Sequence, residues 1–217
     1  MFPLYDESFP SRKLPYITIC LILLNVFIFI FTYLSPNFEE MVFEYEAVPK
    51  RILEGEGVLT LISSMFLHEG FLHLIGNMWF LWLFGDNVEQ NLGKIKFLIF
   101  YLLCGILAGL FHIFLVSVEE SMLPVIGASG AISGVLGGYL ILYPKNKIRA
   151  FFMLYFRPII FSVPAYFYIG IWFLYQFLSV GVPSPVAYFA HIGGFIAGMI
   201  LVLFLRRKII RKSYSEI

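Results

Sequence analysis

The stretch Gly127-Ala128-Ser129-Gly130 opens a short apolar run that extends from residue 130 to 143. It places a serine hydroxyl between glycines in an otherwise lipid-soluble sequence. A second polar side chain, His191, lies within the later apolar run Val186-Ala-Tyr-Phe-Ala-His-Ile-Gly-Gly. Polar residues within membrane spans are costly and usually functional. A serine and a histidine at such positions could form a nucleophile and its base, which points to covalent hydrolysis inside a bilayer.

Composition places the chain among membrane proteins. Of its 217 residues, 60% are hydrophobic and only 13% are charged, against about 25% charged residues in an average soluble domain. The apolar residues form long blocks, which predicts one polytopic bundle surrounded by membrane lipid. No basic stretch is interleaved with aromatic residues on a polar face, so nucleic acid is not an expected partner. Cys20 and Cys104 lie in apolar runs and are interpreted as packing residues.

Six apolar segments are predicted to span the membrane as helices. They cover residues 15–34, 70–87, 97–117, 130–143, 158–179 and 186–205. The expected fold is therefore an all-α membrane protein, a six-transmembrane-helix bundle. Residues 1–14 form an N-terminal segment, 15–205 form one domain with a long first outer loop over 35–69, and 206–217 form a basic tail. The first span is interpreted as a signal anchor that is retained.

The charges of the loops predict the direction of these spans. Thirteen of the 15 basic residues lie on one side of the predicted membrane, and only Lys50 and Arg51 lie on the other. Because positively charged loops stay inside, both termini are expected in the cytoplasm. The expected location is a cell membrane, with the first loop and the polar groups of the spans open to the outer side.

The fourth predicted span is shorter than the membrane is thick. Its 14 residues cover about 21 Å of helix, against roughly 30 Å of hydrocarbon. Residues 121–129 are therefore expected to descend into the membrane as non-helical chain around a water-filled cavity. Ser129 would then begin a helix about 10 Å below the outer surface. His73 and His191, each about one turn down its own span, would reach a similar depth.

Small residues predict how the fourth and sixth spans meet. They are Gly130, Gly134 and Gly138 on the fourth span, and Gly194 and Gly198 on the sixth. Faces without side chains let two helices approach closely, and this packing would bring Ser129 and His191 within reach of each other. The alternatives are a helix-capping role for Ser129 and a structural role for His191.

Two further polar residues share one face of the second span. His73 and Asn77 are four residues apart, so both could donate to the oxygen of a tetrahedral intermediate. No acidic residue is predicted at their depth, which favours a serine–histidine dyad over a triad. His68, His112 and the other histidines have no ligand spacing, so neither a metal nor a cofactor is expected.

Taken together, these motifs resemble those of rhomboid intramembrane serine proteases of the basic six-span form. The segments that carry the resemblance are His68-Glu-Gly-Phe-Leu-His73-Leu-Ile-Gly-Asn77, Gly127-Ala-Ser129-Gly130 and Ala190-His191-Ile-Gly-Gly194 through Gly198. The resemblance implies Ser129 as nucleophile and His191 as general base. It also implies an oxyanion hole formed by the Ser129 backbone N–H, His73 and Asn77.

The activity implied by this resemblance is that of a serine endopeptidase. It would cleave transmembrane helices of single-span or polytopic membrane protein substrates near the outer leaflet. One alternative is a catalytically silent rhomboid-like protein that binds membrane clients for quality control. A channel or transporter is a third possibility, but it would need polar residues continuing through the inner leaflet, where the spans show almost none.

Several positions differ from, or add to, the family's pattern. Many members carry a Trp-Arg pair where the first outer loop of this chain has Leu59-Thr60. Some carry a tyrosine that stacks on the base at the position of Ser133, which leaves a hydroxyl or neighbouring aromatic residues to orient His191. Glu89 resembles a structural glutamate that ties helix ends together. The aromatic fifth span is either a lateral gate, as the resemblance implies, or lipid-facing bulk.

Overall fold

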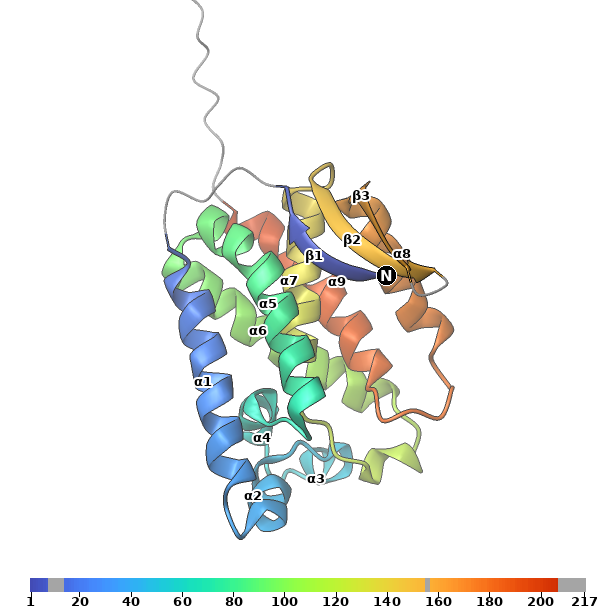
Figure 1. Cartoon of the computed structure of the whole chain (residues 1–217). Helices are drawn as coiled ribbons and strands as arrows, with labels where there is room; N and C mark the ends of the chain where they lie inside the picture. Colours follow the sequence, from blue (N-terminus) through green and yellow to red (C-terminus); the bar gives the residue numbers. More distant parts are fainter. Residues whose placement is uncertain (8–13, 155–156, 207–217) are drawn as a thin grey trace, which may run out of the picture.

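The computed structural model describes residues 1–7, 14–154 and 157–206 and is mainly helical (Figure 1). The predicted basic tail, apart from Arg206, lies outside the described residues. The longer helices are α1 Tyr16–Tyr33, α5 Phe71–Leu92, α6 Lys94–Leu115, α7 Ser129–Leu142, α8 Ala165–Leu178 and α9 Tyr188–Leu205. Helices α1, α6 and α9 are long and apolar enough to cross a membrane, and α7 and α8 are shorter apolar helices.

The remaining elements lie at the two ends of this bundle (Figure 1). Helices α2 Phe38–Tyr45, α3 Pro49–Leu53 and α4 Thr60–Ser63, with the 3-10 turns η1 Ser64–Phe66 and η2 Glu120–Met122, form the loop end. Strands β1 Phe2–Asp6, β2 Lys147–Leu154 and β3 Arg157–Pro164 form an antiparallel sheet in the order β1-β2-β3 at the opposite, sheet end.

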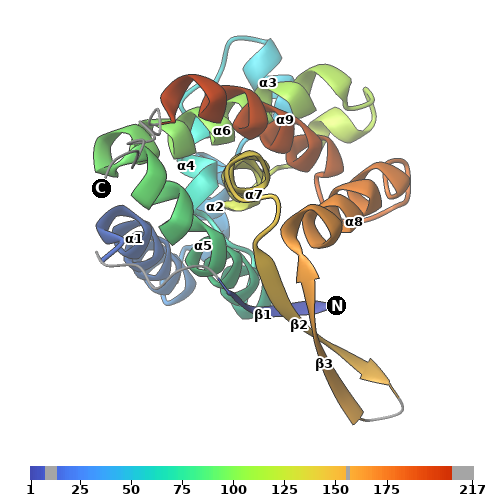
Figure 2. The ribbon, with the colours of Figure 1, turned by 90° about the horizontal axis from the view of Figure 1, so that it is seen from above.

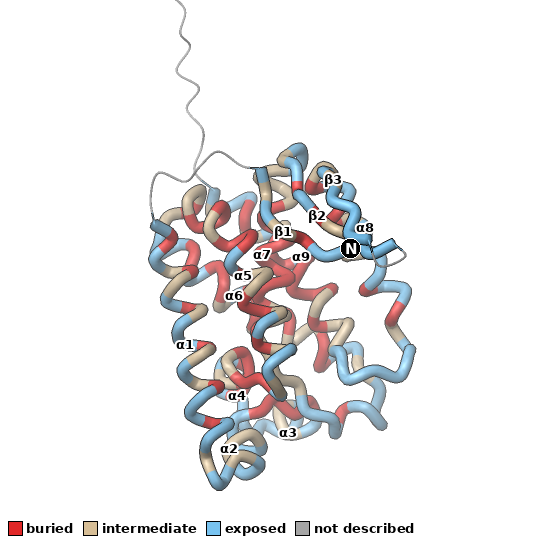
Figure 3. Tube along the Cα trace, viewed as in Figure 1, coloured by how far each residue is buried: buried red, intermediate tan, exposed pale blue. Residues whose placement is uncertain are grey.

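Helix α7 runs through the centre of the bundle, with α5, α6, α8 and α9 around it (Figure 2). It is buried from Ala131 to Tyr139, and Figure 3 shows buried segments concentrated in the middle of the bundle. A Cβ added to Gly194 would collide with the carbonyl oxygen of Gly130, and one added to Gly198 with the backbone of Gly134. Glycine on both helices therefore allows α7 and α9 to pack backbone against backbone.

The sheet is a departure from the predicted all-α fold. Residues 158–164, assigned from the sequence to the start of the fifth span, belong to β3, and α8 begins only at Ala165. The β-branched residues Ile159, Ile160 and Val163 favour a strand. The partner strands supply the rest, since β3 pairs with β2 and β2 pairs with the N-terminal β1. Hydropathy detects that this segment is apolar, but it carries no information on the strands that pair with it, so the sequence alone predicted a helix.

Polar contacts tie the helix ends together at the sheet end. The Glu89 carboxylate accepts hydrogen bonds from the backbone N–H groups of Ile17 and Thr18, at 3.0 and 2.8 Å, and from the Thr18 hydroxyl at 2.9 Å. These N–H groups belong to the first turn of α1, where the helix leaves them without internal partners. Glu89 therefore links α5 to α1, as the sequence analysis expected.

The first loop is anchored without a Trp-Arg pair. The Thr60 hydroxyl donates to the Gly57 carbonyl at 2.6 Å, so this hydrogen bond lies within the loop and does not join the loop to the bundle. Met65 holds the loop instead: its buried side chain fills the space that a Cβ on Gly105 of α6 would need. A β-bridge between Ala47 and Val125 fastens the loop to the segment that precedes α7.

Candidate active site

Ser129 and His191 are in direct contact. Ser129 is the first residue of α7, and His191 lies in the first turn of α9. The Ser129 Oγ and His191 Nε2 atoms are 2.8 Å apart, although the residues are 62 positions apart in the chain. This is the geometry of a serine whose hydroxyl donates to an imidazole.

The chain before Ser129 makes a turn that needs glycine. Gly127 has a φ of +113°, a conformation that side-chain-bearing residues rarely adopt. Its N–H donates to the carbonyl of Ser64 at 2.9 Å, which fixes the turn against the first loop. Because α7 begins at Ser129, the N–H groups of its first turn have no carbonyl partner within the helix and are available to an oxyanion.

His73 and Asn77 approach the same turn from α5. A Cβ on Gly127 would lie 2.7 Å from the His73 Nε2 atom and 3.7 Å from the Asn77 Nδ2 atom. Asn77 also donates to the His73 carbonyl at 3.1 Å, so its amide is held in place. The structure thus brings two side-chain donors from α5 to the residues just before Ser129.

The second ring nitrogen of His191 has a partner that the sequence analysis missed. Gln176 of α8 places its Oε1 atom 2.8 Å from His191 Nδ1. A buried amide in an apolar helix was the signal that could have identified it. Trp172, one turn earlier on α8, lies beside the imidazole with the ring centroids 6.1 Å apart. Ser133 instead donates to the Ser129 carbonyl at 2.7 Å.

Most of these residues line a cavity of about 830 Å³ that reaches from the dyad to the loop end, whereas Gln176 is not part of its lining. His112 of α6 also lines this cavity, near the ring of Phe189. Glu46 of the first loop lies on the cavity wall, and its burial raises the pKa of its carboxyl above the usual 4.5. Within residues 1–7, 14–154 and 157–206, no three His, Cys, Asp or Glu side chains gather as metal ligands would.

Fold and site together define a multi-pass, mainly helical membrane protein with a serine–histidine pair in a cavity of its bundle. The chain belongs to the rhomboid family, because the model of the rhomboid domain matches residues 55–208.

Curated relatives agree with this assignment. "RHOMBOID-like protein 6, mitochondrial" of Arabidopsis thaliana is 32% identical over 70% of this chain and 45% of its own length. "Rhomboid protein 1, mitochondrial" of Saccharomyces cerevisiae is 31% identical over 65% of this chain and 40% of its own length. "Inactive RHOMBOID-like protein 8" of Arabidopsis thaliana is 30% identical over 68% of this chain and 38% of its own length.

Three points follow from these relatives. The matches span less than half the length of the relatives. Two relatives have mitochondrial names, so the expected location in a cell membrane has no support. One is named inactive, so family membership alone does not establish catalysis.

Proposed function

We propose that the protein is an intramembrane serine endopeptidase that uses Ser129 and His191 as a catalytic dyad. The contact of 2.8 Å between Ser129 Oγ and His191 Nε2 is the observation that carries the proposal. In this mechanism His191 takes the hydroxyl proton as Ser129 attacks the substrate carbonyl, and later gives it to the leaving amine. Water from the cavity then hydrolyses the acyl-enzyme.

The oxyanion of the tetrahedral intermediate would lie among donors at the start of α7. The Ser129 N–H is one of them, and the positive end of the α7 dipole adds to it. His73 and Asn77 supply side-chain donors, since both lie against Gly127 two residues before the nucleophile. Such donors act on charge that develops only in the transition state.

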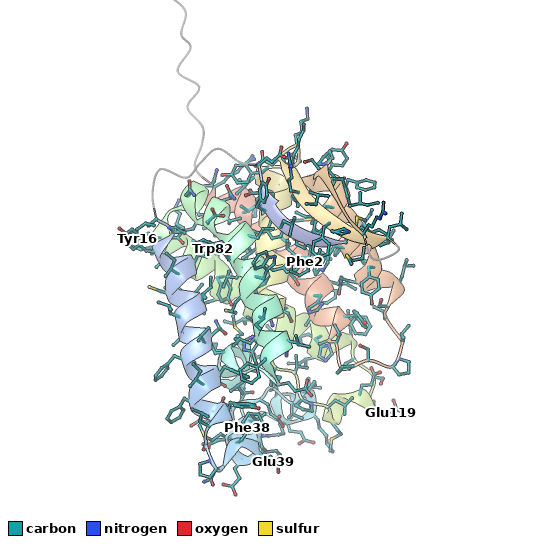
Figure 4. All side chains as sticks on the ribbon, viewed as in Figure 1. Phe2, Tyr16, Phe38, Glu39, Trp82 and Glu119 are labelled. Carbon is teal, nitrogen blue, oxygen red and sulfur yellow. The ribbon has the colours of Figure 1, made fainter. Side chains whose placement is uncertain are left out.

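The proposed membrane arrangement has six spans, with α7 beginning inside the membrane. The loop end faces the outer side, where acidic residues such as Glu39 and Glu119 lie, and the sheet end faces the cytoplasm (Figure 4). At 14 residues, α7 covers about 21 Å, so its first residue would lie below the outer surface. Substrates would therefore be cut in the outer half of a transmembrane helix.

Steric room near the nucleophile favours a small residue on the acyl side of the cut. A Cβ on Gly127 would meet His73 and a Cβ on Gly130 would meet Ala108 of α6, so the walls beside Ser129 leave little room for a large side chain. Helix-weakening Gly or Pro residues further along the substrate would expose the bond. A Phe in place of the small residue is expected to suppress cleavage.

Helix α8 is the proposed lateral gate. Its aromatic residues divide into two groups. Trp172 and Phe173 pack on Phe195 of α9, with ring centroids 6.1 and 4.1 Å apart. Tyr166 and Tyr175 are exposed at the surface of the bundle, which suits contact with lipid or with an entering helix.

The test is labelling of Ser129 by a fluorophosphonate, together with cleavage of a model single-span substrate by the purified protein. Ser129→Ala and His191→Ala are expected to abolish both signals while the protein stays folded in detergent. Ser133→Ala is the matched control, because this serine bonds only the α7 backbone, and it should retain labelling. Cleavage by Ser129→Ala would exclude the proposal, whereas a native protein that neither labels nor cleaves would favour the client-binding alternative.

A further inference from the structure

Gln176 makes a pair of hydrogen bonds that determines the orientation of its amide. The side chain is only 3% exposed, within an apolar helix. Its Nε2 donates to the Trp172 carbonyl at 3.2 Å, which turns Oε1 toward His191 Nδ1 at 2.8 Å. An amide oxygen can only accept a hydrogen bond, so the proton of this contact belongs to Nδ1 of His191.

We propose that Gln176 is a positioning residue that holds His191 in the tautomer a general base requires; this inference rests on the proposed function. With the proton on Nδ1, the lone pair of Nε2 faces the Ser129 hydroxyl. The proton then moves from Oγ to Nε2 and onward to the leaving amine, while Nδ1–H remains bonded to Gln176. The amide has the place that a carboxylate holds in a serine–histidine–aspartate triad, but without charge.

The position of α8 thereby bears on the reactivity of the dyad. Gln176 and Trp172 lie on α8, which packs against α9 and α7 and continues directly from β3. A displacement of α8 would move the acceptor away from His191. The same helix would admit the substrate and orient the base.

Two substitutions separate positioning from packing. Gln176→Met keeps the length of the side chain but removes the acceptor, and should lower kcat about tenfold to a hundredfold with little change in KM, since a buried donor loses its partner. Gln176→Glu keeps an acceptor oxygen and should retain turnover at neutral pH. Its carboxylate should also move the acid limb of the pH–rate profile, a change that a packing role would not produce.

Thermal unfolding of both variants in detergent controls for folding. A kcat of Gln176→Met equal to that of the native protein, or equal losses in the Met and Glu variants, would overturn the positioning role. Neither result would count against the dyad. The proposed function is tested separately, by the loss of activity in Ser129→Ala.

A different observation concerns the β2–β3 hairpin, whose outer half is apolar on both faces apart from Arg157 near its tip. Near the bundle one face is polar, with Arg149 and Ser162 bonded to Glu7 at 2.8 and 2.9 Å, and these bonds lower the pKa of Glu7. Farther from the bundle, polar and apolar residues no longer alternate along the strands. The exposed large apolar residues of both faces there are Phe152, Met153, Leu154, Ile159 and Ile160, each 44–56% exposed. A strand pair in water keeps one polar face.

The hairpin lies at the level where a membrane surface is expected. Phe2, which packs on Phe151 with the ring centroids 5.6 Å apart, is level with the exposed aromatic residues Tyr16 and Trp82 (Figure 4). Aromatic residues of this kind gather at membrane–water interfaces. Helix α8 has 14 residues and covers about 21 Å, so part of the hydrocarbon thickness lies beyond its ends.

We further infer that residues 151–154 and 158–161 lie in the lipid of the leaflet at the sheet end, beside α8, with the guanidinium of Arg157 reaching the headgroups. Figures 1 and 2 show the hairpin extending away from the bundle next to this helix. Interfacial depth suits an open strand edge, because water there can reach its unpaired N–H and C=O groups. Lys147 and Arg149, exposed near the root, lie where lipid phosphates would meet them.

The test uses an environment-sensitive fluorophore in liposomes, attached to single cysteines in a chain whose Cys20 and Cys104 have been replaced. Ile160→Cys and Ser162→Cys lie on the same face of β3, two residues apart. The label at 160 should emit at shorter wavelength and be quenched by nitroxide lipids, whereas the label at 162 should be quenched less. Equal and weak quenching at both sites would place the hairpin in water and reject the inference, whatever the outcome for catalysis.

Discussion

At the scale of the residue, loss of a proposed oxyanion donor should lower the reaction rate less than loss of Ser129 or His191. Removing one such donor typically lowers the rate by about 10²–10³. Asn77→Ala should therefore leave a measurable turnover with little change in substrate binding, because the donor acts mainly in the transition state. Gly76→Ala, where an added Cβ meets nothing within 4 Å, is the neighbouring control. An effect of Asn77→Ala on KM alone would reassign Asn77 to packing.

His68 predicts an acid-sensitive stability. Its burial, and then the nearby His73, lower the pKa of His68 from 6.5 to about 4. Between those values the unfolded chain binds a proton at this residue and the folded protein does not, so stability should fall as the pH drops from 6.5 to about 4. His68→Phe should flatten this part of the curve of Tm against pH. An unchanged slope in the variant would assign the acid sensitivity to other groups.

At the scale of the element, the packing of α7 on α9 sets the distance within the dyad. A Cβ on Gly198 would collide with the backbone of Gly134, which cannot move aside as a side chain can. Gly198→Val should destabilise the bundle by about 1–3 kcal/mol and slow fluorophosphonate labelling of Ser129, as measured by Tm and labelling rate.

Gly170→Ala is the matched helix substitution, since nothing lies within 4 Å of its added Cβ. It should keep both Tm and labelling. Native labelling in Gly198→Val would mean that the dyad tolerates separation of the two helices.

At the scale of the whole molecule, the prediction is the direction of the bundle in the membrane. When the chain is expressed in the plasma membrane of a bacterial host, an impermeant thiol reagent should label Tyr45→Cys at the loop end but not Lys147→Cys at the sheet end, in a chain without its native cysteines. The reason is the asymmetry of basic residues between the two sides. Labelling of Lys147→Cys, with Tyr45→Cys protected, would reverse the topology and place the cavity on the inner side.

The sequence by itself determined where most of the long helices lie. The predicted segments at 15–34, 97–117 and 130–143 correspond to α1, α6 and α7 within a few residues. Apolar length is a property of neighbouring residues, so no tertiary contact is needed to recognise it. The glycines and the polar positions of Ser129 and His191 were visible for the same reason.

Only the tertiary structure decided which groups meet. Strand β3 forms because β2 is there to pair with it, and β2 is paired on its other edge with β1, which comes from the first residues of the chain. Gln176 reaches His191 from a different helix, and Met65 of the first loop packs at Gly105 of α6. Each of these contacts joins residues whose separate sequence contexts say nothing of one another, so their side chains acquire partners only when the helices pack.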